Sequence, residues 1–255
     1  MNMQEIERTL RELRLSGIAA TLSTRVMQAQ STQEPFLDTF AAMLQDELDR
    51  RRSRLTERRF KQSRLDERPT LNDFDWRFNP KLPRQACFEL HTLKFIGEGG
   101  NALIIGKPGT GKSHVAKAVA YQATLQGFVV RYVEADTEFA RYALGSPAEQ
   151  AALLRSFVEP DLIVLDEPVS ALDASVRGEI LALMLRLVQE TGVSILAITH
   201  DLGLAAAFCD DIHVMYAGRF VESGSAQAVL GNPVHPYSAA LLESICRLDT
   251  DPRAP

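Results

Sequence analysis

The chain has 255 residues, 45% hydrophobic and 24% charged, as is ordinary for a globular protein with a sizeable core. No apolar run approaches the ~20 residues of a membrane-spanning helix, and the first residues lack the basic and apolar regions of a signal peptide. The three cysteines are widely spaced and offer no metal-ligand pattern. We therefore expect a cytoplasmic protein rather than a secreted or membrane-spanning one.

Residues 1–68 predict helices. Apolar residues recur at near-helical spacing in the first part of this stretch, at Ile6, Leu10, Leu13, Ile18 and Leu22. Ser31 or Thr32 is expected to cap a second helix. The apolar residues of that helix are Phe36, Phe40, Met43, Leu44 and Leu48.

The second helix continues into an arginine-rich run, although the net charge of the chain is −5. Between Leu48 and Arg64 only Asp49 and Glu57 oppose the basic residues Arg50, Arg51, Arg52, Arg54, Arg58, Arg59, Lys61 and Arg64. Such a run is either a solvated helix face or a surface that contacts the phosphates of nucleic acid. At helical spacing, one face would carry Arg51, Arg54, Arg58 and Lys61.

A linker is expected over residues 69–82. Pro69 breaks the preceding helix, and the following Asn72 and Asp73 favour turns. The aromatic residues Phe74, Trp76 and Phe78 are expected to anchor the linker to the core of the next domain, because buried aromatic rings carry a large apolar area. A helix is then expected over residues 83–96.

A phosphate-binding loop follows. Residues 106–113 fit the pattern G-x-x-x-x-G-K-[ST], between an apolar strand at 101–105 and a helix at 113–126 that ends at Gly127. In such a loop, backbone N–H groups and the helix N-terminus bind phosphates. The predicted cofactor-binding residues are Gly106, Lys107, Pro108, Gly109, Thr110, Gly111, Lys112, Ser113 and His114. Lys112 would reach the β- and γ-phosphates of ATP, and the Ser113 hydroxyl would bind Mg²⁺.

Two acidic residues stand at the end of a later strand. A second strand is expected at 128–133, then a helix at 137–157 that Pro147 interrupts. Residues 161–167 form an apolar strand that ends in Asp166 and Glu167, as a Walker B element does. Asp166 would hold Mg²⁺, and Glu167 would polarise the attacking water.

The next buried strand ends in a histidine. An amphipathic helix is expected over 176–190 and a strand over 194–200, with His200 last. In an open parallel sheet, ligands bind beyond the carboxyl ends of the strands, so Thr199 and His200 are expected near the γ-phosphate. Residues 212–221 predict a strand pair turning at Ala217-Gly218, and a helix through Leu241 and Ile245 follows.

One resemblance covers residues 1 to about 165. The stretches 45–48 with 50–64, then 71–76, 93–96 and 106–115, in that order, resemble the IstB-like helper ATPases of bacterial transposons, relatives of the replication helicase loader and the AAA+ family. In that family the N-terminal helical part contacts DNA and neighbouring subunits. The resemblance therefore implies that the arginine-rich run binds duplex DNA, that a transposase is a partner and that the protein is a homo-oligomer.

A second resemblance covers residues from about 163 to 246. The stretches 165–173, 198–202, 214–219 and 232–237 resemble the ATP-binding subunits of oligopeptide and dipeptide importers. This implies a Walker B aspartate at Asp166, a catalytic glutamate at Glu167, a D-loop aspartate at Asp173 and a switch histidine at His200. The chain departs from that family between Lys112 and Asp166, where it has no Leu-Ser-Gly-Gly-Gln-like signature. We therefore expect a chimeric chain joined at the Walker B strand, with one continuous sheet.

The predicted fold is an α/β P-loop NTPase with a mostly parallel sheet flanked by helices, preceded by a small α-helical domain. Its expected parts are a helical DNA and oligomerisation domain (1–68), a linker (69–82), an IstB-like ATPase core (83–165), an importer-like continuation (166–246) and a flexible tail (247–255).

The predicted function is ATP binding and Mg²⁺-dependent hydrolysis in a DNA transposition helper. One alternative is an ATP-binding subunit for peptide import, whose partners would be membrane transporter subunits. The other is an ATP-dependent DNA-binding assembly module with negligible turnover. The arginine-rich run favours DNA, and the missing signature disfavours transport.

Overall fold

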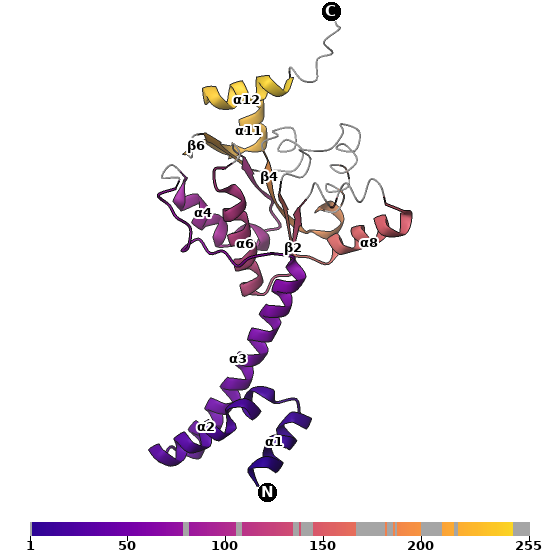
Figure 1. Ribbon diagram of the computed structural model, residues 1–255. Coiled ribbons are helices and arrows are strands. Elements are labelled where there is room, and N and C mark those ends of the chain that lie inside the picture. Colours follow the sequence, from indigo (N-terminus) through magenta and orange to yellow (C-terminus); the bar gives the residue numbers. More distant parts are fainter. Residues whose placement is uncertain are drawn as a thin grey trace, which may run out of the picture. The chain divides into compact units, whose positions relative to one another are not determined.

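The computed structural model describes residues 2–78, 82–105, 109–134, 138, 145–166, 182, 186, 188–199, 211–216 and 219–246 (Figure 1). The contacts between residues divide the chain into two compact units, Met1–Arg58 and Arg59–Pro255. None of the described helices combines the length and the apolar composition that are needed to cross a bilayer.

The first unit is helical, as predicted. Its helices are α1 (Met3–Glu12), α2 (Ser16–Thr32) and the greater part of α3 (Phe36–Ser63). Asn2 and Glu5 cap the start of α1 reciprocally, each side chain accepting from the backbone N–H of the other residue. Gln33 ends α2 in the left-handed conformation, with φ 52°.

The prediction that Ser31 or Thr32 caps the second helix is wrong. Both residues lie in the last turn of α2, where their hydroxyls donate to the carbonyl of Gln28 at 2.8 and 2.9 Å. A hydroxyl that bonds back to the preceding turn is satisfied inside the helix and is not used as a cap. The chain turns after α2, and the carbonyl of Pro35 accepts hydrogen bonds from the first turn of α3.

An acidic residue of α3 holds the start of α2. The Glu47 carboxylate accepts the backbone N–H groups of Gly17 and Ile18. A side chain at Gly17 would not fit, because its Cβ would stand 2.6 Å from Glu47 Cα. Arg25 and Asp46 add a second link between α2 and α3, a bidentate ion pair with its shorter bond at 2.7 Å.

The second unit is built on one six-stranded sheet. The strands are β1 (Ala102–Ile105), β2 (Val130–Glu134), β3 (Leu162–Asp166), β4 (Ser194–Thr199), β5 (Asp211–Tyr216) and β6 (Arg219–Ser225). Their order in the sheet is β2-β3-β4-β1-β5-β6. All neighbouring strands are parallel except β5 and β6. The predicted fold class, a mostly parallel sheet flanked by helices, is confirmed.

The sheet is continuous across the expected join. Strand β1, from the part that resembles the helper ATPases, pairs with β4 on one side and with β5 on the other. Both β4 and β5 belong to the part that resembles the importer subunits. The apolar strands of the two parts therefore form one hydrogen-bonded sheet, as predicted.

Two predicted helices have different limits in the structure. The single helix expected over 83–96 is wrong, because the buried Leu93 has φ 64° and separates α4 (Arg84–His91) from α5 (Lys94–Gly97). Pro147 does not interrupt a helix but begins α8 (Pro147–Val158), behind a capping box of Ser146 and Glu149. Proline suits a first helical turn, where its missing N–H would have no helical partner. Helix α6 (Lys112–Gln126) ends at the left-handed Gly127, as predicted.

The C-terminal elements also follow the prediction. Strands β5 and β6 form the expected antiparallel pair. Two helices follow, α11 (Ala226–Gly231) and α12 (Pro236–Cys246). Residues 217–218, where the turn was expected, and most of the helix expected at 176–190 lie outside the described residues.

The core of the second unit lies around α6. Helix α6 packs against β2, β3 and β4 (Figure 1). Leu71 and Phe74, from the expected linker, are buried in the same cluster, and the Trp76 ring packs against it. The predicted anchoring of this segment by aromatic residues is confirmed for Phe74 and Trp76, whereas Phe78 is 67% exposed.

Candidate nucleotide-binding site

The phosphate-binding loop joins β1 to α6, as predicted. Gly109 and Gly111 have φ 74° and 94°, a region in which side chains other than glycine are strained. Lys112, the first residue of α6, is buried. It lies at the helix N-terminus, where anions are favoured. Three further predicted cofactor contacts of the loop, residues 106–108, lie outside the described residues.

The structure brings together the two predicted Mg²⁺ ligands. Ser113 Oγ, in the first turn of α6, donates to Asp166 Oδ1 at 3.3 Å. Asp166 is the last residue of β3. Adjacent ligands in an octahedral Mg²⁺ shell stand about 3 Å apart, and both atoms are the oxygen donors that this ion prefers. The pair therefore fits a magnesium ion.

Tyr132, which sequence analysis did not identify, completes this arrangement. It lies on β2, and its hydroxyl donates to Asp166 Oδ2 at 2.7 Å. Two effects contribute most to the raised pKa of Tyr132: the larger is desolvation by burial, and the smaller is the hydrogen bond to Asp166. Both carboxylate oxygens of Asp166 thus accept a hydroxyl. A tyrosine inside a strand carries no sequence signal of such a contact.

Glu167 and His200, the predicted catalytic residues, lie outside the described residues. Each directly follows a described strand end, Asp166 of β3 and Thr199 of β4. Strands β3 and β4 pair in parallel, and Thr199 pairs with Ile105, the last residue of β1. The strand ends that precede these two residues therefore lie at the same sheet edge as the phosphate-binding loop.

The segment before α4 packs on the phosphate-binding loop. A Cβ at Gly111 would stand 3.0 Å from Phe74 Cζ. The Phe74 ring lies 5.0 Å from the imidazole of His114, and the carbonyl of Thr70 lies 3.5 Å from His114 Nε2. The His114 side chain thus contacts this segment. Sequence analysis missed these long-range contacts.

Lys117 fixes the same segment one turn further along α6. Its amine donates to Asp66 at 2.8 Å and to Glu67 at 3.2 Å. Although desolvation opposes it, the hydrogen bonds to these acids raise the pKa of Lys117. The start of α6 is thereby held by charged and aromatic contacts from residues 66–74.

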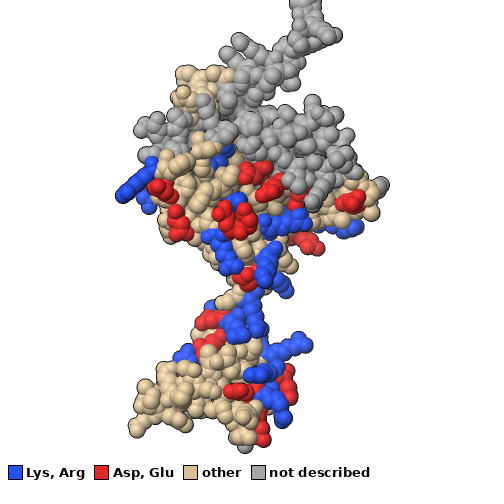
Figure 2. Space-filling view, viewed as in Figure 1, with Lys and Arg blue, Asp and Glu red and all other residues tan. Residues whose placement is uncertain are grey.

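The residues of the arginine-rich run differ in their surroundings. Arg54, Arg58 and Lys61 are exposed and form no ion pair with any described residue. Arg51 donates to Glu47 Oε1 at 2.7 Å. Arg64 lies beyond the end of α3, with φ 62°, and pairs with Glu138. Figure 2 shows basic side chains gathered along this part of α3, with acidic ones among them.

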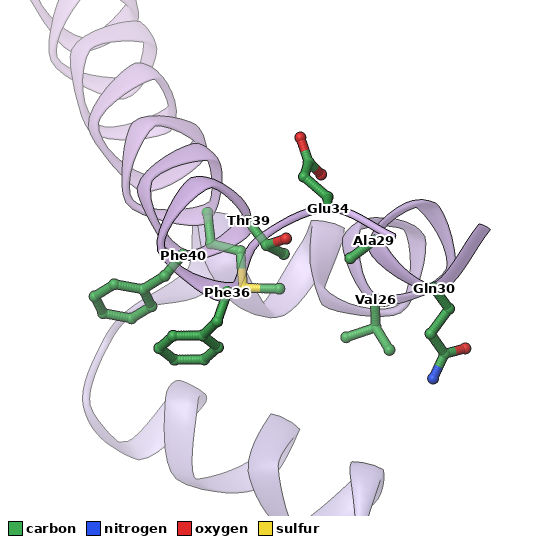
Figure 3. Close-up of a pocket in the computed structure, with 8 residues that line it drawn as sticks. Val26, Ala29, Gln30, Glu34, Phe36, Thr39 and Phe40 are labelled. Carbon is green, nitrogen blue, oxygen red and sulfur yellow. The ribbon is translucent and has the colours of Figure 1, made fainter. Parts of the chain in front are cut away.

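An apolar pocket of about 370 Å³ lies between α2 and α3 in the first unit (Figure 3). It is lined by Val26, Ala29, Gln30, Glu34, Phe36, Thr39, Phe40 and Met43. The Phe36 and Phe40 rings stack with centroids 5.9 Å apart, and Phe36 is 79% exposed.

A mostly parallel sheet with a glycine-rich loop, a lysine and a serine at the start of the following helix, and an aspartate at the end of β3, defines a P-loop NTPase. Among these proteins, the chain belongs to the family of IstB-like ATP binding proteins, whose family model matches residues 8–211. This match extends past the join that we expected near residue 165. The protein is thus an ATP-binding P-loop protein of the IstB-like type.

The chain is also similar to importer subunits, so both predicted resemblances are confirmed. It is 44% identical over 110 residues to the dipeptide transport ATP-binding protein DppF of Escherichia coli, which is 43% of this chain and 33% of that protein. It is 48% identical over 92 residues to the oligopeptide transport ATP-binding protein OppD of Salmonella typhimurium, which is 36% of this chain and 28% of that one. The matched part therefore spans about a third of these relatives.

Several solved structures resemble this chain weakly. The crystal structure of DnaI aligns with 15% identity and a TM-score of 0.46, over 70% of this chain and 87% of that one. AMPPCP-bound DnaA from Aquifex aeolicus aligns with 21% identity and a TM-score of 0.43, over 54% and 43%. CbiO1 of Clostridium perfringens, part of an ABC transporter complex, aligns with 19% identity and a TM-score of 0.39, over 59% and 87%.

Proposed function

We propose that the protein hydrolyses ATP with Mg²⁺ and uses the nucleotide cycle as a helper of DNA transposition. The observation that supports hydrolysis is the hydrogen bond from Ser113 of the phosphate-binding loop to Asp166 at the end of β3. Residues from two elements more than fifty positions apart meet there with the chemistry of a magnesium site.

In this proposal each residue has a distinct task. The loop amides and Lys112 bind the phosphates, and Ser113 and Asp166 hold Mg²⁺. The ion would neutralise charge on the transferred phosphoryl group. The roles proposed for the two residues that follow β3 and β4 are polarisation of the attacking water for Glu167 and an interaction with the γ-phosphate for His200. The attack transfers the terminal phosphoryl group of ATP to water, which leaves ADP and phosphate.

The DNA-contacting surface in this proposal is the basic part of α3. Arg54, Arg58 and Lys61 are exposed side chains that phosphates could reach without breaking an ion pair to a described residue. The contact would be with duplex DNA and a transposase would be the partner, as in the helper ATPases that the sequence resembles. Residues 1–68 would then serve DNA binding and oligomerisation, and the proposed ATPase core would extend from 83 to 246.

We also propose that the oligomer uses an apolar stripe on α3. In a heptad repeat, the a and d positions of this helix are Leu37, Ala41, Leu44, Leu48, Arg51 and Leu55. Leu37 is 74% exposed and Leu48 is 48% exposed. The side chains of α3 that face α2 are Thr39, Met43, Asp46 and Glu47. At about 100° per residue, the apolar stripe lies roughly 140° around the helix from them. Within the first unit α2 therefore does not cover the stripe, and a second copy of the chain could pack against it.

Charge favours an antiparallel pairing of two copies of α3. In a parallel pair Arg51 would face Arg51, which is repulsive. In an antiparallel pair with Leu44 opposite Leu48, Arg51 faces the small Ala41, and Asp38 of one copy faces Arg52 of the other. This pairing is symmetric, since both copies use the same surface.

Sedimentation velocity with the full chain tests the pairing. The double variant Leu44→Glu, Leu48→Glu is expected to give monomers, whereas Leu13→Glu, at an exposed leucine that directly follows α1, should not. Asp38→Arg should weaken association, and adding Arg52→Asp should restore it. In a parallel pair these positions lie about 21 Å apart along the helix, so no restoration is expected.

A binding assay separates the proposed function from its alternatives. Filter binding of duplex DNA is measured with and without ATP, together with phosphate release. A transposition helper should bind DNA in an ATP-dependent manner and release phosphate. An assembly module should bind without release. A peptide-import subunit should bind no DNA, and that result would overturn the proposal.

A further inference from the structure

We infer that Tyr132 is a positioning residue for the magnesium site, holding the Asp166 carboxylate in the orientation that meets the metal. This inference rests on the proposed function of the site. Tyr132 touches no reacting atom in this proposal and acts through Asp166.

The strand register places the two side chains in contact. Strands β2 and β3 pair in parallel, with Tyr132 opposite Val164 and Glu134 opposite Asp166. The tyrosine therefore lies two positions behind the aspartate on the neighbouring strand. A phenol is long enough to cover that distance, and its hydroxyl reaches Asp166 Oδ2 at 2.7 Å. A shorter hydroxyl residue at position 132 would not reach it.

Tyr132 itself has little freedom to move. Its side chain is buried, with 4% of its surface exposed, in the cluster around α6. The Lys117 amine lies 5.5 Å from the centre of its ring, a distance typical of a cation–π contact. The phenol donates its hydroxyl hydrogen to the Asp166 carboxylate, which can only accept.

The hydroxyls of Tyr132 and Ser113 each donate to a different oxygen of the Asp166 carboxylate. Tyr132 occupies Oδ2, whereas Oδ1 points to Ser113, the other predicted ligand. Without the phenol hydroxyl, the carboxylate could rotate about its Cβ–Cγ bond. Among the described residues, the hydrogen bond that would remain on it is the longer one from Ser113. Hydrogen-bond partners behind a metal ligand commonly contribute about 10- to 100-fold in metal affinity. The hydroxyl also withdraws some charge from the carboxylate, but we expect orientation to outweigh this effect.

Tyr132→Phe tests the inference, because it removes one oxygen and keeps the buried ring. The readout is binding of a fluorescent ADP analogue to the full chain, titrated with Mg²⁺ and repeated in EDTA. The Mg²⁺ concentration that gives half of the effect should rise about 10-fold or more. Binding in EDTA should be unchanged, because the phosphate-binding loop is intact.

Tyr121→Phe is the matched control. Tyr121 lies on α6, half-buried, with its ring against Phe60, and no described residue receives a hydrogen bond from its hydroxyl. Its Mg²⁺ titration should match that of the parent protein. Thermal unfolding of both variants shows whether the ring still packs. A general loss of structure would lower binding in EDTA as well, and would contradict a positioning role.

A second variant makes the result specific to Asp166. In an Asp166→Ala background, adding Tyr132→Phe should cause no further change in the Mg²⁺ titration. An unchanged titration in Tyr132→Phe alone overturns the inference while leaving the proposed function in place. If the parent protein itself shows no Mg²⁺-dependent binding, the proposed metal site fails, and the inference fails with it.

Discussion

Arg51 Nε lies 2.7 Å from Glu47 Oε1, one turn back along α3, while Oε2 of the same carboxylate accepts the backbone N–H of Gly17. One acidic side chain thus joins the basic run to the start of α2. An acid at a helix N-terminus is favourable, because it satisfies a free N–H and complements the helix dipole. Glu47 therefore stabilises the first unit, and its ion pair with Arg51 competes with any contact between that arginine and DNA phosphates.

Glu47→Ala is expected to destabilise the helices of the first unit. It leaves the buried Gly17 N–H unpaired, which costs about 1–3 kcal/mol. The free energy of unfolding, followed by the circular dichroism of the full chain in denaturant, measures this loss. Asp49→Ala, at an exposed acid on the same helix, is the control and should change stability by less than about 0.5 kcal/mol. Equal effects of the two variants would show that the Gly17 contact adds no stability.

The contribution of Glu47 should depend on pH. Desolvation by burial would raise the pKa of its carboxyl, but the hydrogen bonds from Arg51 and from the Gly17 and Ile18 amides outweigh it and lower the pKa. A lowered pKa means that the unfolded chain binds the proton more readily, so stability rises with pH. The difference between parent and Glu47→Ala should be largest above the ordinary pKa of about 4.3 and become smaller as the pH falls further. A difference that grows in acid would contradict this sign.

The elements with local signals were predicted well. The order of strand, loop and helix around the phosphate-binding loop follows from the sequence alone. Its signals are local: the apolar run of β1, the loop glycines, and Gly127 at the end of α6. The β5–β6 pair followed from β-rich residues around a turn signal.

Features that depend on long-range contacts could not be predicted. Leu93 is left-handed although nothing local requires it, and it is buried with 3% of its surface exposed, so packing outweighs its local preference. The contacts of Tyr132 with Asp166 and of Phe74 with the Gly111 region join segments that lie far apart in the chain. Periodicity carries no signal of such pairs, and only the strand register and the folded core bring them together.

Gly111→Ala is expected to impair nucleotide binding. Its φ of 94° is strained for alanine, and the new Cβ would press on the Phe74 ring from 3.0 Å. The left-handed conformation alone costs about 1–2 kcal/mol. Gly99→Ala is the control, since Gly99 has φ 68° but nothing within 4 Å of a Cβ. Calorimetric titration with ATP should show weaker binding for Gly111→Ala alone, and Phe74→Leu should restore part of it. Restoration would fail if Phe74 did not press on the loop.

Lys112→Ala and Glu167→Gln are expected to separate binding from turnover. Loss of the Lys112 cation should weaken ATP binding by at least about 2 kcal/mol, because a charge-assisted contact to phosphate is removed.

Glu167→Gln keeps the volume of the side chain but cannot polarise water as a carboxylate does, so it should bind ATP and release little phosphate. Calorimetry and a phosphate-release assay on each variant test this. Parental turnover in Glu167→Gln would remove Glu167 from the catalytic role.

The last prediction concerns DNA binding by α3. Arg54, Arg58 and Lys61 are exposed and unpaired with described residues, whereas Arg51 is held by Glu47. If three phosphates are neutralised, log affinity should fall with log salt at a slope near −2.7, and near −3.6 if Arg51 leaves Glu47 and joins them. Mobility shifts across a series of salt concentrations measure the slope.

Alanine at Arg51, Arg54, Arg58 and Lys61 should flatten this slope and weaken binding equally for unrelated DNA sequences, since phosphates carry no sequence information. ATP binding should remain nearly intact. The matched control removes four exposed arginines elsewhere, at Arg8, Arg11, Arg77 and Arg155, and so changes the net charge by the same amount. If position on α3 matters, only the first variant loses the salt dependence. Equal losses in both variants would mean that net charge alone attracts DNA, and identical binding by the first variant and the parent would reduce the run to a solvated helix face.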